Sequence, residues 1–153
     1  QLVLEPAPKE VIAAVLGIES NFGENLGNYN PFNVYVSLYF SGHGQKWALS
    51  QLEELMIFCK RNNSDIFDLK SSYAGAMTSA QFLPYSMNRW HVGNDLEEVI
   101  NGAKSAANYL SHFEERAGNL KTALLRYNPS TVYTQTVVDL ASVAGYEPKF
   151  RYY

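Results

Sequence analysis

Cysteine is almost absent from this 153-residue sequence, in which Cys59 is the only one, so no disulfide can form within the chain. Cys59 lies in the stretch LEELMIFCKR, an apolar helical pattern that predicts a buried, unreactive thiol. A Cys/His protease is therefore disfavoured. The three histidines, His43, His91 and His112, lack the spacing of metal ligands. We expect neither a metal site nor a cofactor.

Charged residues are also scarce, at 18% of the chain, and the net charge is −3. Without an excess or a run of Lys and Arg, nucleic acid is disfavoured as a partner. No apolar run approaches the roughly 18 residues of a membrane span. The sequence begins with Gln1 in place of Met, which indicates a processed or trimmed chain and is consistent with the removal of an export signal.

The residues that are abundant predict one all-α domain over residues 1–153, with residues 1–8 as an extended lead-in. Hydrophobic residues make up 46% of the chain, which is enough to form a core. Aromatic residues make up 14%, and they could either pack in this core or bind sugars. We expect a first helix that ends near Gly23 or Gly27, and a loop over 71–90 containing a short helix that ends before Pro84. Segment 34–40 is expected to be helical or irregular. Further helices are expected over 47–61, 96–116, 120–127 and 131–144. Helical spacing puts five residues of the 47–61 helix on one apolar face: Leu49, Leu52, Leu55, Met56 and Cys59.

Glu19 is the first candidate for a chemical role, because it lies on the same helical face as Val15 and Ile12. Burial and the negative end of the helix dipole both favour a protonated carboxyl group. Such a group is what general acid catalysis on an acetal requires. The alternative is a partly exposed surface glutamate.

Two more segments are rich in small or polar residues. The segment SSYAGAMTSAQF, residues 71–82, combines glycine and alanine with the neutral polar groups of Ser72 and Gln81. The segment RYNPSTVY, residues 126–133, places Tyr127 and Asn128 at a helix end and Tyr133 one turn into the next helix. A tightly packed turn and a capped helix corner would explain these patterns equally well.

Taken together, the three segments resemble the lysozyme-like lytic murein transglycosylases, especially the membrane-bound type. The matching elements are ESNFG at 19–23, SYAGAMTSAQFLPYS at 72–86 and YNPSTVY at 127–133. The resemblance covers residues 9–144 approximately. It implies a lysozyme-like fold with a substrate cleft, and cleavage of the β-1,4 bond between N-acetylmuramic acid and N-acetylglucosamine in peptidoglycan.

The resemblance also implies roles for individual residues. Glu19 would be the single acid/base, and Ser72 would hydrogen-bond the acetamido group of the substrate. The remaining matches would contact the sugar or face Glu19: Gln81, Tyr127, Asn128 and Tyr133. The expected partner is a peptidoglycan strand. We expect the protein to be a monomer without a membrane span, located in the periplasm or secreted.

Departures from the family pattern leave the reaction product open. Thr78 replaces a usual glycine and would add a branched side chain beside the cleft. The segment HVGND after Trp90 is too short for the acidic loop of longer relatives, so we expect no calcium site. A lysozyme-type hydrolase and a non-catalytic wall-binding module are the two alternatives. Glu24, Asp95 and Glu97 could supply a second carboxylate, although surface positions are expected for them.

Overall fold

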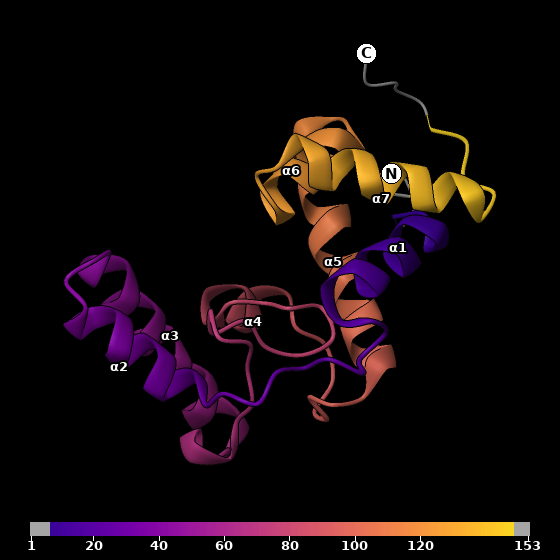
Figure 1. The fold of residues 1–153 in the computed structure, drawn as a ribbon. Coiled ribbons are helices and arrows are strands. Elements are labelled where there is room, and N and C mark those ends of the chain that lie inside the picture. The colour runs from indigo at the N-terminus through magenta and orange to yellow at the C-terminus, as the bar shows by residue number, and fades with distance from the viewer. Residues whose placement is uncertain (1–6, 149–153) are drawn as a thin grey trace.

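The computed structural model describes residues 7–148, and this range contains seven α-helices, one 3₁₀ helix and no sheet (Figure 1). The predicted all-α class is confirmed. Most of the expected lead-in, residues 1–6, lies outside the described residues. No helix among the described residues is both long and apolar enough to cross a membrane. In chain order the elements are α1 (Lys9–Ser20), α2 (Pro31–Phe40), α3 (Gln45–Asn62), η1 (Ile66–Asp68), α4 (Pro84–Trp90), α5 (Val99–Ala117), α6 (Leu120–Tyr127) and α7 (Thr131–Val143).

Two groups of helices flank a central region that contains α4 and the long loops (Figure 1). Helices α2 and α3 pack together as a hairpin at the lower left, whereas α1, α5, α6 and α7 form the larger group on the other side. Within the larger group, α5 contacts both α1 and α6, and α1 packs along α7. The first and last helices of the described chain are therefore neighbours, which matters for the site below.

Side-chain caps define several of these helices. The side chains of Asn30, Asn119 and Ser130 accept hydrogen bonds from backbone N–H groups in the first turns of α2, α6 and α7. Such caps satisfy N–H groups that have no partner within the helix, and each contributes about 1 kcal/mol. The caps of α6 and α7 explain why these two short helices begin where the sequence predicts.

An aromatic cluster fills the core beneath α4 and α6. Tyr109 of α5 lies at its centre, with ring centroids 4.8 Å from Trp90, 4.7 Å from Phe113 and 5.0 Å from Tyr127. Phe82 closes the cluster, 5.7 Å from Tyr109. Tilted and edge-on aromatic pairs at such distances are each worth about 0.5–1.5 kcal/mol beyond the area that they bury.

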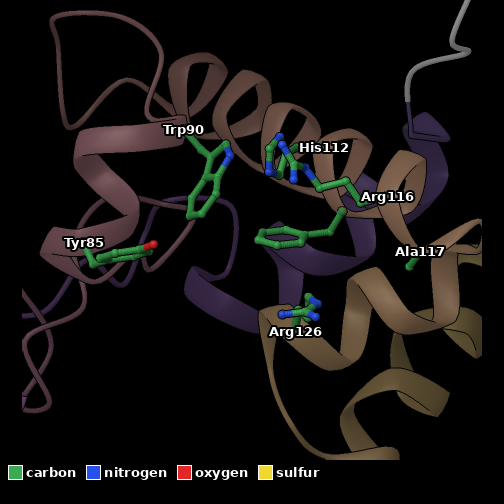
Figure 2. Close-up of a pocket in the computed structure, with 7 residues that line it drawn as sticks. Tyr85, Trp90, His112, Arg116, Ala117 and Arg126 are labelled. Carbon is green, nitrogen blue, oxygen red and sulfur yellow. The ribbon is translucent and has the colours of Figure 1, made fainter.

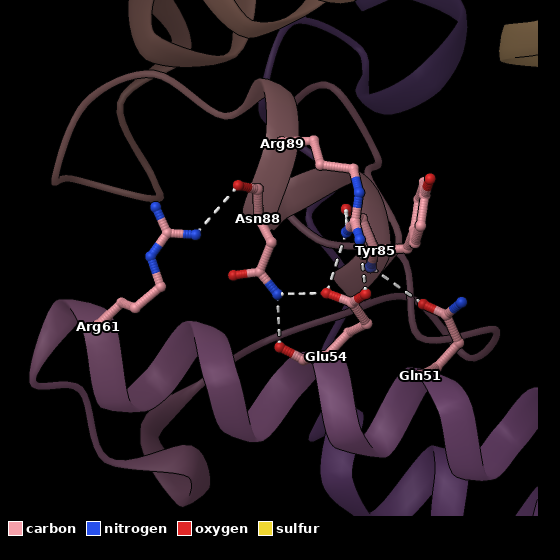
Figure 3. A network of polar contacts seen from close by, with 6 residues as sticks. All are labelled: Gln51, Glu54, Arg61, Tyr85, Asn88 and Arg89. Carbon is pink, nitrogen blue, oxygen red and sulfur yellow. Dashed lines mark hydrogen bonds and ion pairs between the residues drawn. The ribbon is translucent and has the colours of Figure 1, made fainter.

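A polar network joins α4 to α3 (Figure 3). The Glu54 carboxylate accepts hydrogen bonds from Asn88, at 2.7 Å, and from Arg89, at 3.0 Å. The side-chain oxygen of Gln51 accepts a bond from the backbone N–H of Tyr85 at 3.1 Å. These bonds hold the helical hairpin against α4, and therefore against the central region.

Three details differ from the sequence prediction. Pro84 begins a helix, and does not follow one, because proline at the first helical position sacrifices no hydrogen bond. Helix α1 ends at Ser20, before Gly23. On α3, Leu49 and Met56 were expected on the packed face but are 47% and 61% exposed. Segment 34–40 is helical, and Cys59 is buried as predicted.

Candidate active site

The end of α1 positions Glu19. Val11 and Val15 are fully buried on the packed face of this helix, and Glu19 follows one turn later, half-buried. The chain then turns sharply, because Asn21 and Phe22 both adopt left-handed backbone conformations, with φ of 48° and 55°. The glutamate therefore lies at the last turn of the helix, between the core and the surface.

The phenol of Tyr133 donates a hydrogen bond to Oε1 of Glu19 at 2.7 Å. Tyr133 is buried on α7, so a residue from the last helix reaches the end of the first. Burial raises the pKa of Glu19, and the bond from Tyr133 opposes this by favouring the ionised form. Burial and the adjacent Glu19 also raise the pKa of Tyr133, which stays a proton donor. The direction of the Glu19 shift is the one that the sequence predicts.

A tight turn over residues 77–82 lies next to this pair. Met77 and Phe82 exchange two backbone hydrogen bonds, both of 2.8 Å, and close the turn. Thr78 and Gln81 within it have left-handed φ angles of 65° and 52°. Left-handed backbone is strained for a β-branched residue such as threonine. The Thr78 hydroxyl accepts a bond from the N–H of Ala80, which helps to hold this conformation.

Two hydroxyl groups fasten the turn to the helices around Glu19. The buried Ser20 donates to the carbonyl oxygen of Ser79 at 2.8 Å, and Tyr127 donates to that of Ala80 at 2.5 Å. Burial and the nearby Glu19 charge raise the pKa of Tyr127. Glu19, Tyr127 and Tyr133 therefore form one polar wall. The sequence places Ser20 beside Glu19 in the ESNFG element, but it gave no indication that the Ser20 hydroxyl would fasten this turn.

Ser72 lies in a separate turn that leads into the first one. Its hydroxyl oxygen accepts hydrogen bonds from the N–H groups of Ala74 and Ala76, at 3.3 and 3.2 Å, which leaves its hydrogen available to donate. Gly27, from the loop that follows α1, lies directly against the backbone of Ser71 and Ser72. This loop ties Ser72 to the end of α1, although no hydrogen bond joins Ser72 to Glu19.

The other predicted residues occupy the margins of the wall. Gln81 donates from its side chain to the carbonyl oxygen of Thr78, at 2.9 Å. Asn128 caps the end of α6 and is half-buried, and no hydrogen bond joins it to Glu19.

The possible second carboxylates are engaged elsewhere. Glu24 pairs with Asn21, and Glu97 pairs with Lys70 at 2.7 Å. Asp95 accepts a bond from the backbone N–H of Glu97. All three are exposed, as expected, and none forms a hydrogen bond with Glu19. Among residues 7–148, no group of three or more His, Cys, Asp or Glu could hold a metal ion.

Comparisons with known proteins agree on one family. The family model "Transglycosylase SLT domain" matches residues 7–120. Membrane-bound lytic murein transglycosylase B of Escherichia coli K12 is 28% identical over an alignment of 109 residues, and the match covers 67% of this chain. Those residues cover only 30% of that relative, so the chain spans less than a third of its length.

Solved structures show the same fold at lower identity. The lytic transglycosylase SltB1 of Pseudomonas aeruginosa superposes with a TM-score of 0.81 at 20% identity, over 89% of this chain and 69% of that one. Slt35 of E. coli gives 0.77 at 18% identity, over 89% and 65%. SltB3 of P. aeruginosa, in complex with NAG-NAM-pentapeptide, gives 0.79 at 20% identity, over 90% and 57%. The predicted lysozyme-like transglycosylase fold is confirmed.

Proposed function

The chain belongs to the transglycosylase SLT domain family, and we propose that it cleaves the β-1,4 bond between N-acetylmuramic acid and N-acetylglucosamine in peptidoglycan. The relative from E. coli is a murein transglycosylase, and the SltB3 structure holds a glycan fragment that carries a peptide. We extend the proposal accordingly to peptide-bearing strands. One observation carries it above all: Glu19 is half-buried, its pKa is raised by burial, and Tyr133 holds its carboxyl group.

A single carboxyl group is sufficient for this reaction when the substrate assists. Most glycosidases use two carboxylates, but in substrate-assisted enzymes the acetamido group of the sugar replaces one. Protonated Glu19 donates its proton to the bridging oxygen as the bond from that oxygen to the anomeric carbon breaks. The acetamido oxygen attacks the same carbon and supplies the electron pair. The engagement of Glu24, Asp95 and Glu97 elsewhere supports a mechanism with one carboxylate.

The second step decides the product. In a transglycosylase, O6 of the muramoyl residue attacks the anomeric carbon, the acetamido group leaves, and the Glu19 carboxylate takes the O6 proton. The result is a 1,6-anhydro end, formed without water. Ser72 suits the orienting role, because its hydroxyl oxygen already accepts two backbone bonds and its hydrogen can donate to the acetamido group.

Hydrolysis would use the same site with water in place of O6. Thr78 is the residue that raised this alternative, because a branched side chain was expected beside the cleft. Thr78 is instead 4% exposed and lines a small cavity with Leu26, Leu69 and Leu96, in which none of the predicted site residues takes part. This position gives no particular support to hydrolysis, so we retain the transglycosylase reaction.

Mass spectrometry of digested cell wall tests the proposal. We expect anhydro ends; reducing ends would mean a hydrolase, and an unchanged polymer would mean a binding module. Glu19→Gln should lower the rate by about 100-fold or more, since the general acid is lost, while sedimentation with insoluble wall stays unchanged. Glu24→Gln is the matched control and should retain activity. Substantial cleavage by Glu19→Gln would overturn the assignment.

The proposed substrate lies in the bacterial envelope. We therefore also propose a periplasmic or secreted location and action as a monomer. Fractionation of cells that express the full-length protein tests the location, and light scattering tests the monomer. Recovery of the full-length protein from the cytoplasm would contradict the first of these.

A further inference from the structure

A pocket of about 360 Å³ lies where α4, α5 and α6 meet (Figure 2). Its volume falls within the roughly 300–1,000 Å³ that is usual for small-ligand sites. Figure 2 shows Tyr85 and Trp90 on one side, His112 and Arg116 on the other, and Arg126 below. None of the six predicted site residues lines this pocket. We refer to it as the arginine pocket.

Aromatic rings form much of its wall. The ring centroid of Trp90 is 5.1 Å from that of Phe113 and 5.5 Å from that of His112. Trp90 is buried at its back, whereas Tyr85 is exposed at the rim. Rings packed in this way offer rigid apolar faces to a ligand at little cost in conformational entropy, since their neighbours already fix them.

Two exposed cationic side chains line the pocket together with this aromatic wall. Arg116 and Arg126 are exposed, and neither has a carboxylate within salt-bridge distance among residues 7–148. The guanidinium of Arg126 lies 5.3 Å from the centroid of the Phe113 ring, so it is held over the pocket by a cation–π contact. The chain as a whole has a net charge of −3. Among the described residues, this pocket therefore presents two arginine side chains that no carboxylate pairs with, and both are available to an anion from outside.

Tyr109 connects this pocket to the candidate active site. Its ring packs against Trp90 and Phe113 on the pocket side and against Tyr127 on the other. Its hydroxyl donates to the carbonyl oxygen of Arg126 at 2.8 Å. The ring of Tyr109 therefore lies between the arginine pocket and the wall that contains Glu19. Of two neighbouring residues on α6, Arg126 lines the pocket and Tyr127 belongs to the wall.

We propose that the arginine pocket binds the carboxylate of a peptide attached to the glycan strand. Arginine holds a carboxylate through two parallel hydrogen bonds, and the aromatic faces suit the small apolar side chain next to it. The pocket is too small for several sugar units but can accept one or two amino-acid residues. This inference rests on the proposed function, because it assumes a strand that carries peptides.

Binding is tested first with a free peptide, N-acetyl-alanyl-alanine, prepared with both residues in either L or D configuration. Titration is followed by the NMR signal of the Trp90 indole N–H. We expect saturable shifts with the carboxylate form and none with the C-terminal amide. The Arg116→Ala/Arg126→Ala variant should bind about tenfold or more weakly, since it loses charge-assisted hydrogen bonds.

The matched control is Lys46→Ala/Lys104→Ala, which removes the same charge from exposed positions on α3 and α5 outside the pocket. It should bind like the wild type. Equal weakening in both double variants would reduce the effect to net charge and overturn the proposal. Equal binding of the amide form, or tighter binding of inorganic phosphate, would also overturn it.

Cleavage then separates this inference from the proposed function. Wild-type protein should cleave peptide-bearing strands with a KM about tenfold lower than that for strands stripped of peptide, and the arginine variant should lose this preference. If wild-type protein cleaves neither strand, the proposed function fails, and the peptide titration alone decides on the pocket. If both strands are cleaved alike and the free peptide does not bind, the pocket inference fails while the function stands.

Discussion

Removing one hydroxyl group from Tyr133 should have an effect that depends on pH. Tyr133→Phe eliminates the bond of 2.7 Å to Oε1 of Glu19 and leaves the ring in place. When Glu19 is protonated, the loss is that of an ordinary hydrogen bond, about 0.5–1.5 kcal/mol. When Glu19 is ionised, the lost bond is charge-assisted and worth about 1.5–3 kcal/mol. The penalty should therefore grow by about 1–1.5 kcal/mol as pH rises through the pKa of Glu19.

The sign follows from proton linkage. Burial raises the pKa of Glu19 in the folded protein, so its proton contributes stability below the unfolded pKa, and this stability is lost as pH rises through the folded pKa. The bond from Tyr133 favours the ionised form and limits that loss. Without it, the pKa of Glu19 rises further. The variant should therefore lose more stability on the alkaline side than the wild type does.

The assay is urea and thermal unfolding from about pH 4 to about pH 9, where 1 kcal/mol corresponds to roughly 2–4 °C in Tm for a chain of this size. The control is Tyr109→Phe, which removes a bond to a backbone carbonyl. Burial raises the pKa of Tyr109 to about 12, so in the wild type this hydroxyl keeps its proton over the whole pH range. The loss of stability caused by Tyr109→Phe should therefore be the same at every pH. The alkaline limb of activity should move to higher pH in Tyr133→Phe alone. A penalty for Tyr133→Phe that is the same at every pH would refute the reasoning.

Two further changes test the supports of the site. Gly27 has φ of +85°, so Gly27→Ala should lower the free energy of unfolding by roughly 1–2 kcal/mol through left-handed backbone strain. The new methyl group would also overlap the carbonyl oxygen of Ser71, which should cost about 1–3 kcal/mol more. Gly42→Ala, with φ of +81° and open space, should show only the strain, and equal losses in urea unfolding would contradict this. Glu54→Gln should cost about 1 kcal/mol at neutral pH by weakening the pair with Arg89. Because the bond from Arg89 lowers the pKa of Glu54, this stability is lost as pH falls through the folded pKa, so thermal unfolding in acid should no longer distinguish the variant.

Hydrophobic spacing and capping residues were sufficient to predict most of the helices. Ser130, for example, caps α7 through its side chain, and its position in the sequence predicts this. The apolar face of α3 was not predictable in the same way. Gln51 is buried there and bonded to the backbone of Tyr85, while Leu49 and Met56 face outward. The choice of face depends on where α2 and α4 pack, which the period of α3 alone does not contain.

The candidate site was predictable to the extent that side chains form it. The carboxyl group of Glu19 was expected on an apolar face, and it lies there, half-buried. The acceptors that anchor the 77–82 turn are main-chain carbonyl groups of Ser79 and Ala80. Every residue has a main-chain carbonyl group, so the sequence alone does not show which of these groups accept the hydrogen bonds. The left-handed conformation of Thr78 was not predictable for the same reason, because it is set by main-chain hydrogen bonds that close the turn.

The carboxyl group and the phenol that restrains it are separated by 114 residues and belong to opposite ends of the described chain. The stretch that matches the family model ends at residue 120, so it contains Glu19 but neither Tyr127 nor Tyr133. The proposed acid and the phenol that moderates its pKa thus come from separate parts of the chain. Under the proposed function, substitutions in the last helix would shift the pH range of activity without changing any residue of the stretch that matches the family model.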